Sequence, residues 1–144
     1  MFNSVLVVCV GNICRSPMGE RMLRSKLPGM KIDSAGIGAL VGHGADKTAR
    51  EAGAEVGVDL DGHVARQMSS EIGARYDLIL VMEPGHKAEV GRRWPQLSGK
   101  TMLFDQWAGA RGIADPYRKP IEYHREIRDL ISQAADGWAA RLKR

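Results

Sequence analysis

A cysteine and an arginine stand six residues apart near the start of the chain, as Cys9 and Arg15 of VVCVGNICRSP. Between them, Gly11 permits close backbone approach, and Asn12 is a residue type that tolerates a left-handed backbone. A tight turn into a helix points backbone N–H groups inward and adds the positive end of the helix dipole, which favours a tetrahedral oxyanion. Arg15 can bind two oxygens of that anion. We expect a phosphate-binding loop made of Val10, Gly11, Asn12, Ile13, Cys14 and Arg15.

The same positive field acts on the sulfur of Cys9, because a thiol beside a helix N-terminus and a cation loses its proton more readily. A thiolate below a bound phosphate is placed for in-line attack on phosphorus and would form a phosphocysteine intermediate. Ser16 can donate its hydroxyl proton to that sulfur while its oxygen caps the following helix. We therefore expect Cys9 to be a nucleophile that Ser16 stabilises as a leaving group.

The segment ADPYRKP supplies a candidate proton donor, Asp115. A phenol leaving group gains from a positioned acid, because its departure at neutral pH requires a proton. Pro116 stiffens this segment, and Tyr117 can flank an aromatic substrate. The same residues also fit an ordinary Asp-Pro turn without a catalytic role.

These residues need elements that hold them together. The apolar run 4–10 predicts a strand covered on both faces, as in a parallel sheet. Ser16 stands where an N-cap belongs and Pro17 suits a first helical turn, so a helix should follow. Its buried stripe would consist of Met18, Met22, Leu23 and Leu27. Ligands bind outside the carboxyl ends of strands in such sheets, which is where this loop lies.

Strand and helix patterns alternate along the rest of the chain. Further strands are predicted at 31–35, 76–82 and 100–104, and helices at 46–55, 83–94 and Ile121–Leu142, with a surface loop at GIGALVGHGA. The last helix is marked by apolar residues at three- and four-residue steps: Ile127, Leu130, Ile131, Ala134, Trp138 and Leu142. This alternation predicts a single open, mostly parallel four-stranded α/β sheet with helices on both faces.

Length and composition limit the possible classes of protein. The 144 residues, 44% hydrophobic and 26% charged, suit one soluble domain over 1–144. The N-terminus has neither a basic leader nor a long apolar core, so we expect a cytoplasmic chain without direct membrane insertion. Two cysteines are too few for a secreted disulfide framework. The net charge of +4 favours anionic partners.

The motifs together resemble a known family. The residues CVGNICRS and DPY, with DSAG at 33–36 and HVARQ at 63–67, make the chain similar to low-molecular-weight protein tyrosine phosphatases. MFNSVLVVCVGNICRSP, GALVGHGAD and DPYRKP resemble the bacterial branch that serves exopolysaccharide or capsule production. The resemblance implies hydrolysis of phosphotyrosine without a cofactor. It also implies a phosphotyrosine protein as partner, namely a membrane tyrosine autokinase, and a monomer or weak dimer.

The resemblance also implies roles for single residues. Cys9 would be the nucleophile, Arg15 the phosphate clamp, and Asp115 the acid and then the base. The family ties its loop asparagine to nearby hydroxyls and a histidine, which here are Asn12, Ser16, Ser34 and His63. Such a network would hold a strained loop with its N–H groups already directed at the phosphate. A solvent-exposed loop histidine is the alternative for His63.

The chain departs from many eukaryotic members at two positions, where Leu40 replaces an aromatic residue and Arg118 replaces a second tyrosine. We expect Leu40 and Tyr117 to form the substrate wall, with a more basic rim suited to acidic or multiply phosphorylated tails. Cys14 would close a disulfide with Cys9 under peroxide, or else be a buried packing residue.

Other functions remain open from the sequence. An arsenate reductase would need further cysteines, and none follows Cys14. A cysteine phosphocarrier of related fold would accept phosphate without hydrolysis, whereas Arg15 and Asp115 favour turnover. We expect no nucleic-acid partner, because no basic stripe is interleaved with aromatic residues. We also expect no metal, because the four histidines lack ligand spacing.

Overall fold

Four parallel strands form the centre of the structure, a computed structural model that describes residues 2–143. Their order in the sheet is β2-β1-β3-β4. The strands are β1 (Ser4–Cys9), β2 (Lys31–Gly36), β3 (Leu78–Val81) and β4 (Thr101–Leu103). In the register, Val5 of β1 stands between Ile32 and Leu78. The predicted α/β class with an open parallel sheet is confirmed.

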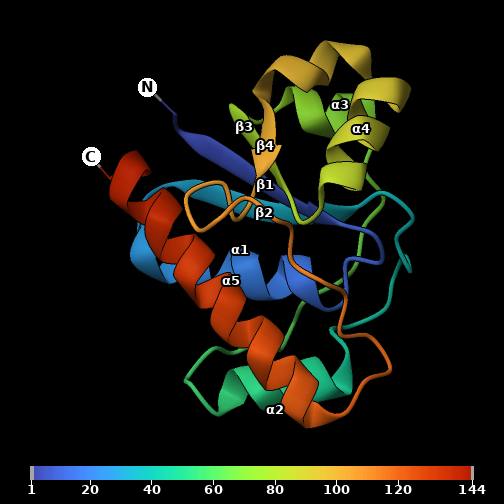
Figure 1. Cartoon of the computed structure of the whole chain (residues 1–144). Coiled ribbons are helices and arrows are strands. Elements are labelled where there is room, and N and C mark those ends of the chain that lie inside the picture. Colours follow the sequence, from blue (N-terminus) through green and yellow to red (C-terminus); the bar gives the residue numbers. More distant parts are fainter. Residues whose placement is uncertain (1, 144) are drawn as a thin grey trace.

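Helices cover both faces of this sheet (Figure 1). On one side lie α1 (Arg15–Lys26) and the long α5 (Ile121–Leu142), with α2 (Lys47–Ala54) packed beyond them against α5. On the other side lie α3 (Ser70–Ala74), α4 (Pro84–Arg93) and the 3₁₀ helix η1 (Pro95–Lys100). Within residues 2–143, no helix combines the length and the apolar character that crossing a membrane requires.

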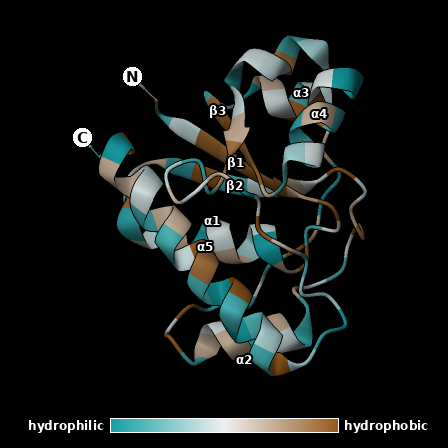
Figure 2. Ribbon diagram, in the orientation of Figure 1, coloured by the Kyte–Doolittle hydropathy of each residue, from teal (hydrophilic) through white to brown (hydrophobic). Residues whose placement is uncertain are grey.

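The strands alternate between two hydrophobic cores, because successive side chains of a strand point to opposite faces. Val5 and Val7 belong to the core under α1 and α5, whereas Leu6 and Val8 belong to the core under α4. All six residues of β1 are buried. The strands accordingly form the hydrophobic centre of the ribbon in Figure 2, between helices with many polar residues. This two-sided burial explains why β1 reads as a continuous apolar run.

Most predicted elements occur with ends shifted by one or two residues, and α5 has the predicted bounds. Two short elements, α3 and η1, were not predicted. The stripe of Met18, Met22, Leu23 and Leu27 is buried as expected. Leu130 was wrongly assigned to the buried face of α5, since it is 44% exposed. Leu130 lies about 80° around α5 from the centre of the stripe formed by Ile127, Ile131, Ala134, Trp138 and Leu142, at its margin rather than within it.

Candidate active site

The site lies at the carboxyl end of β1, where the chain turns into α1. The turn is held by a neighbouring segment, because Ile37 N–H donates to the Cys9 carbonyl (2.9 Å) and Leu40 N–H to the Gly11 carbonyl (3.0 Å). Gly36 allows this approach, since a Cβ atom there would stand 2.3 Å from the Val10 carbonyl oxygen. The loop after β2 thus brings Leu40 beside the phosphate-binding loop.

Asn12 stabilises the loop from within. Its backbone has a φ of 59°, and its side chain is fully buried. The amide Nδ2 donates to Ser16 Oγ (2.7 Å) and Ser34 Oγ (3.0 Å), while Oδ1 accepts from Arg66 N–H (3.0 Å). His63 Nε2 lies 2.6 Å from the Asn12 carbonyl oxygen, and His63 is buried. The structure therefore brings Asn12, Ser16, Ser34 and His63 together.

The hydroxyl of Ser16 lies 2.9 Å from the Cys9 sulfur. Because Ser16 Oγ already accepts from Asn12, its own proton is available to the sulfur. Ser34 is in the corresponding position on the other side of Asn12 and donates to the buried carboxylate of Glu20 (3.0 Å). A buried chain of hydrogen bonds thus runs from Cys9 to Glu20.

The prediction that Ser16 caps the helix is wrong. Helix α1 begins at Arg15 with Cys14 in the N-cap position, and no side chain in the described part of the protein caps it. Ser16 lies inside the first turn, where its hydroxyl is bonded to Cys9 and Asn12 instead. No capping side chain among residues 2–143 therefore accepts a hydrogen bond from the backbone N–H groups in the first turn of α1.

Arg15 is held by contacts from two distant segments. Its side chain is 2% exposed, and one terminal nitrogen donates to Glu83 Oε2 (2.5 Å) and to the Ile113 carbonyl (2.7 Å). The other terminal nitrogen lies 3.8 Å from Asp115 Oδ2. Sequence reasoning missed Glu83 and Ile113. The only signal for Glu83 was an acidic residue just after a predicted buried strand.

His86 lies close to the ion pair of Arg15 and Glu83, with its Nε2 3.3 Å from Glu83 Oε2. Burial and then the nearby Arg15 charge lower the pKa of His86, which outweighs the opposite effects of Glu83 and Asp115. The ring is therefore neutral near pH 7, and the carboxylate neighbour assigns its proton to Nε2. His86 is thus a neutral neighbour of Glu83 and adds no second positive charge beside Arg15.

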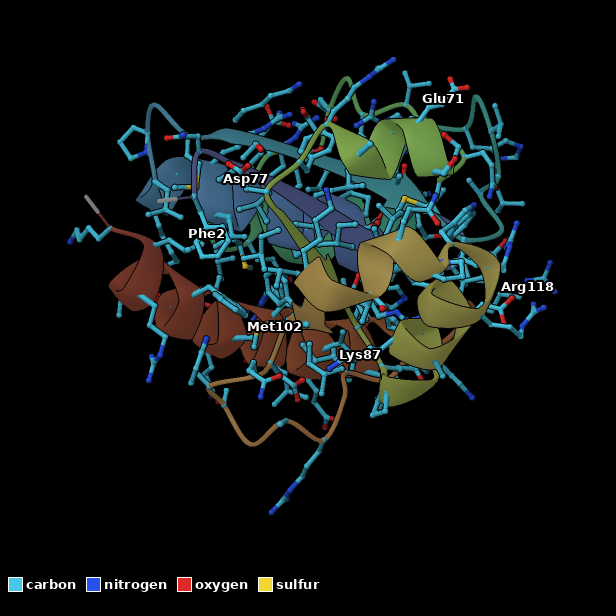
Figure 3. All side chains as sticks on the ribbon, turned by 90° about the horizontal axis from the view of Figure 1, so that it is seen from above. Phe2, Glu71, Asp77, Lys87, Met102 and Arg118 are labelled. Atoms are coloured by element: carbon cyan, nitrogen blue, oxygen red, sulfur yellow. The ribbon has the colours of Figure 1, made fainter. Side chains whose placement is uncertain are left out.

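A cavity of about 190 Å³ opens above the loop. Besides residues of the β1–α1 turn, it is lined by Gly38, Leu40, Asp115 and Tyr117. Asp115 is half-exposed, and its Oδ1 accepts from Tyr117 N–H (3.0 Å). The Arg118 guanidinium lies 5.2 Å from the centre of the Tyr117 ring, at the periphery of the molecule (Figure 3). The cavity therefore brings Arg15 and Asp115 together with two large side chains, Leu40 and Tyr117.

Cys14 has a different environment from the reactive position expected for Cys9. Both cysteines are free and buried. Burial, with smaller contributions from Asp46 and Cys9, raises the pKa of the Cys14 thiol. Cys14 is therefore a neutral thiol at physiological pH, and its disulfide with Cys9 under peroxide stays a prediction.

Comparison with known proteins matches residues 4–144 to the family described as "Low molecular weight phosphotyrosine protein phosphatase". The chain is 50% identical over 143 residues to the low molecular weight protein-tyrosine-phosphatase Etp of Escherichia coli K12, covering 99% of this chain and 97% of Etp. Wzb of Escherichia coli K30, solved with sulphate, has 47% identity and a TM-score of 0.97, with 99% of each chain covered.

A second solved relative is Wzb of Vibrio vulnificus in complex with benzylphosphonate. It has 48% identity and a TM-score of 0.97, and the match covers 99% of this chain and 100% of that one. The family match is to phosphatases rather than to the arsenate reductases or phosphocarriers considered from the sequence. The expected family is thereby confirmed: the chain belongs to the low molecular weight protein-tyrosine-phosphatases, in the branch of Wzb and Etp.

Proposed function

We propose that Cys9 takes the phosphoryl group from a phosphotyrosine side chain, with Arg15 and Asp115 as its catalytic partners. The observation that carries this proposal is that the three side chains converge on one cavity. The Cys9 thiolate attacks phosphorus opposite the phenolic oxygen. The P–O bond breaks as Asp115 gives its proton to that oxygen, leaving phosphocysteine and free tyrosine.

In the second step a water molecule attacks the phosphorus of phosphocysteine. The Asp115 carboxylate, now deprotonated, takes a proton from this water while the P–S bond breaks. The departing Cys9 thiolate receives a hydrogen bond from Ser16, which lowers the barrier to its release. Arg15 and the loop N–H groups bind the phosphoryl oxygens through both transition states. The products are inorganic phosphate and the starting enzyme.

The walls of the cavity support an aromatic ester as substrate. Leu40 and Tyr117 line the cavity together with the expected phosphate-binding loop, and a phosphotyrosine ring would pack between them. The complex of the related Wzb with benzylphosphonate supports the same assignment, because that ligand joins an aromatic ring to a phosphoryl-like group.

The proposed partner is the phosphorylated tyrosine segment of a membrane tyrosine autokinase, and the proposed process is exopolysaccharide or capsule production. Membership in the Wzb and Etp branch supports this. Exposed cations near the acid loop also suit an acidic or multiply phosphorylated tail: Arg111, Arg118 and Lys119. The proposal places the enzyme in the cytoplasm, as a monomer or weak dimer, which sedimentation of the purified protein tests.

Substrate trapping tests chemistry and partner together. We expect Cys9→Ser to abolish hydrolysis of para-nitrophenyl phosphate. Immobilised Asp115→Ala should retain a phosphorylated autokinase until vanadate releases it. Asp129→Ala, an exposed position on α5, serves as the control that neither loses activity nor retains the kinase. Activity in Cys9→Ser would contradict the chemistry. Retention of a phosphotyrosine peptide but not of the kinase would contradict the partner.

A further inference from the structure

One buried carboxylate closes the loop between β4 and Asp115. Asp105 follows β4 closely and is only 5% exposed. Its Oδ2 accepts from the backbone N–H groups of Arg111 (3.0 Å) and Gly112 (2.9 Å). Its carbonyl also accepts from Ala110 N–H (2.9 Å). Hydrogen bonds to an ionised acceptor are stronger than neutral ones, so Asp105 is the main polar attachment of this loop.

The far end of the loop is fixed against the turn that carries Glu83. Ile113 N–H donates to the Met82 carbonyl (2.7 Å). Gly112 has a φ of +94°, and a Cβ atom there would stand 3.0 Å from Pro84 Cδ. Only a residue without a side chain fits this contact without strain. The two N–H groups that Asp105 binds thus lie at or next to the place where Gly112 and Ile113 contact the turn at Met82–Pro84.

Residues at and just after this contact touch Arg15. The Ile113 carbonyl accepts the hydrogen bond from Arg15 (2.7 Å). Two residues later, Asp115 places its Oδ2 3.8 Å from the other terminal nitrogen of Arg15. A shift of the Gly112 backbone would therefore displace both the carbonyl that orients Arg15 and the carboxyl that serves as the acid.

Packing holds the first part of this loop, where Trp107 lies edge-on to Trp138 of α5, but open space borders its later part. A cavity of about 420 Å³ lies between that part and α5, beside Asp105, Arg111, Gly112 and Gln133. Room to move therefore exists on the α5 side once the hydrogen bonds to Asp105 are lost.

Stability alone does not account for a carboxylate at this position. Asp105 Oδ1 is buried and has no hydrogen-bond partner among residues 2–143. Leaving a buried polar atom unpaired is unfavourable. Retaining a polar side chain under that penalty points to a requirement for the position of the backbone that it holds.

We propose that Asp105 is a positioning residue for proton transfer by Asp115. Its carboxylate holds the backbone of Arg111 and Gly112, and this sets the place from which Asp115 delivers its proton. Asp105 does not touch the substrate. This inference rests on the proposed role of Asp115 as the acid.

The test is kcat/KM for hydrolysis of a series of aryl phosphates whose phenols differ in acidity. An impaired general acid slows the hydrolysis of esters of weakly acidic phenols most, and the hydrolysis of nitrophenyl esters least. For Asp105→Ala we expect about a tenfold loss of kcat/KM on phenyl phosphate, part of the factor of 10²–10⁴ that general acid catalysis contributes. The ratio kcat/KM reports the first step, whereas breakdown of phosphocysteine is the same for every substrate. The loss on dinitrophenyl phosphate should be about twofold, because that phenolate needs little assistance. Asp105→Asn keeps one acceptor oxygen and should recover most of the rate.

Matched variants separate positioning from general damage. Gln133→Ala alters the same cavity from α5 and should leave the series unchanged. Gly112→Ala pushes the loop from Pro84 while Asp105 stays intact, and should reproduce the dependence on the leaving group even where Asp105→Ala does not fold. Uniform losses in Asp105→Ala and Gly112→Ala, beside a leaving-group-dependent loss in Asp115→Asn, would overturn this inference alone. A uniform loss in Asp115→Asn would instead overturn the proposed acid.

Discussion

The guanidinium of Arg15 lies 2.5 Å from the carboxylate of Glu83, and this contact joins the start of α1 to the start of α4. Since β1 and β3 are neighbours in the sheet, the two helix starts meet at the same edge. Glu83 and the Ile113 carbonyl occupy one nitrogen of Arg15 and hold the planar group in one orientation. We expect the other terminal nitrogen, which lies 3.8 Å from Asp115, to bind phosphate.

Replacing Glu83 tests whether this orientation matters. We expect Glu83→Gln to lower kcat/KM for aryl phosphates about tenfold, equivalent to about 1.4 kcal/mol, because Arg15 loses its charged partner. Steady-state kinetics on para-nitrophenyl phosphate measures this. Glu89→Gln on the same helix removes only a surface pair with Arg92 and should behave as wild type. Equal kinetics for the two variants would contradict the role of Glu83.

Removing the Ser16 hydroxyl should slow breakdown of the phosphocysteine intermediate. Without its hydrogen bond, the Cys9 thiolate is a poorer leaving group, so Ser16→Ala should lower kcat about tenfold, the range of a charge-assisted hydrogen bond. Rapid mixing with para-nitrophenyl phosphate should show a burst of nitrophenol as the intermediate accumulates. Ser25→Ala, exposed on the same helix, provides the control. A slower first step without a burst would show that Ser16 acts elsewhere.

Two replacements of Asn12 separate backbone strain from side-chain bonding. Alanine loses the hydrogen bonds and leaves the φ of 59° strained, whereas glycine loses the same bonds but accepts that φ. We expect both variants to lose turnover, and Asn12→Gly to be more stable than Asn12→Ala by about 1 kcal/mol in urea denaturation. Wild-type turnover in Asn12→Gly would mean that only the backbone shape, and not the network, supports catalysis.

Alkylation should distinguish the two cysteines. Burial raises the pKa of Cys14, so its thiol stays protonated and unreactive, while Cys9 is expected to react as a thiolate. Iodoacetamide at pH 7 should add one adduct to the folded protein, at Cys9, by mass spectrometry. Folded Cys9→Ser should take up none, and the same variant in denaturant should take up one. Modification of Cys14 in the folded protein would refute its assignment as an inert thiol.

Glu55 should make stability depend on acid pH. Its pKa is lowered from 4.5 to about 2, chiefly by the hydrogen bond from Arg125 and also by Arg128, which link α2 to α5. As pH falls, the unfolded state takes up the proton first, so this stabilisation is present above pH 4.5 and lost toward pH 2. Urea denaturation at pH 5 and pH 3 should therefore show a smaller loss for Glu55→Gln than for wild type. Glu51→Gln, an exposed position on α2, should keep the wild-type loss.

The fold was largely predictable, because its main elements carry strong patterns. β1 is buried on both sides and therefore apolar throughout, and α5 shows a long stripe of apolar residues. The short α3 and η1 escaped, because five or six residues are too few to show a helical period. Leu130 shows a related limit. Its spacing places it near the edge of the apolar stripe of α5, and only the packing of the neighbouring elements determines whether a residue at that edge is buried.

The site was predictable where its residues are adjacent in sequence. Cys9, Asn12, Arg15 and Ser16 lie within eight consecutive residues between the end of β1 and the first turn of α1, so their chemistry can be read from their spacing. Ser34, Leu40 and His63 came from the family resemblance. The groups that position Arg15, namely Glu83 and the Ile113 carbonyl, lie 68 and 98 residues away. Their approach depends on the strand order, which the sequence does not encode locally.

The buried hydrogen bonds beneath the loop have opposite directions on the two sides of Asn12. Its amide donates toward Ser16 on one side and toward Ser34 on the other, and each hydroxyl donates onward, to Cys9 and to Glu20. A proton relay requires every member to donate in the same sense, so Asn12 interrupts conduction along this path. Along this path the Cys9 sulfur is thereby insulated from the interior carboxylate of Glu20.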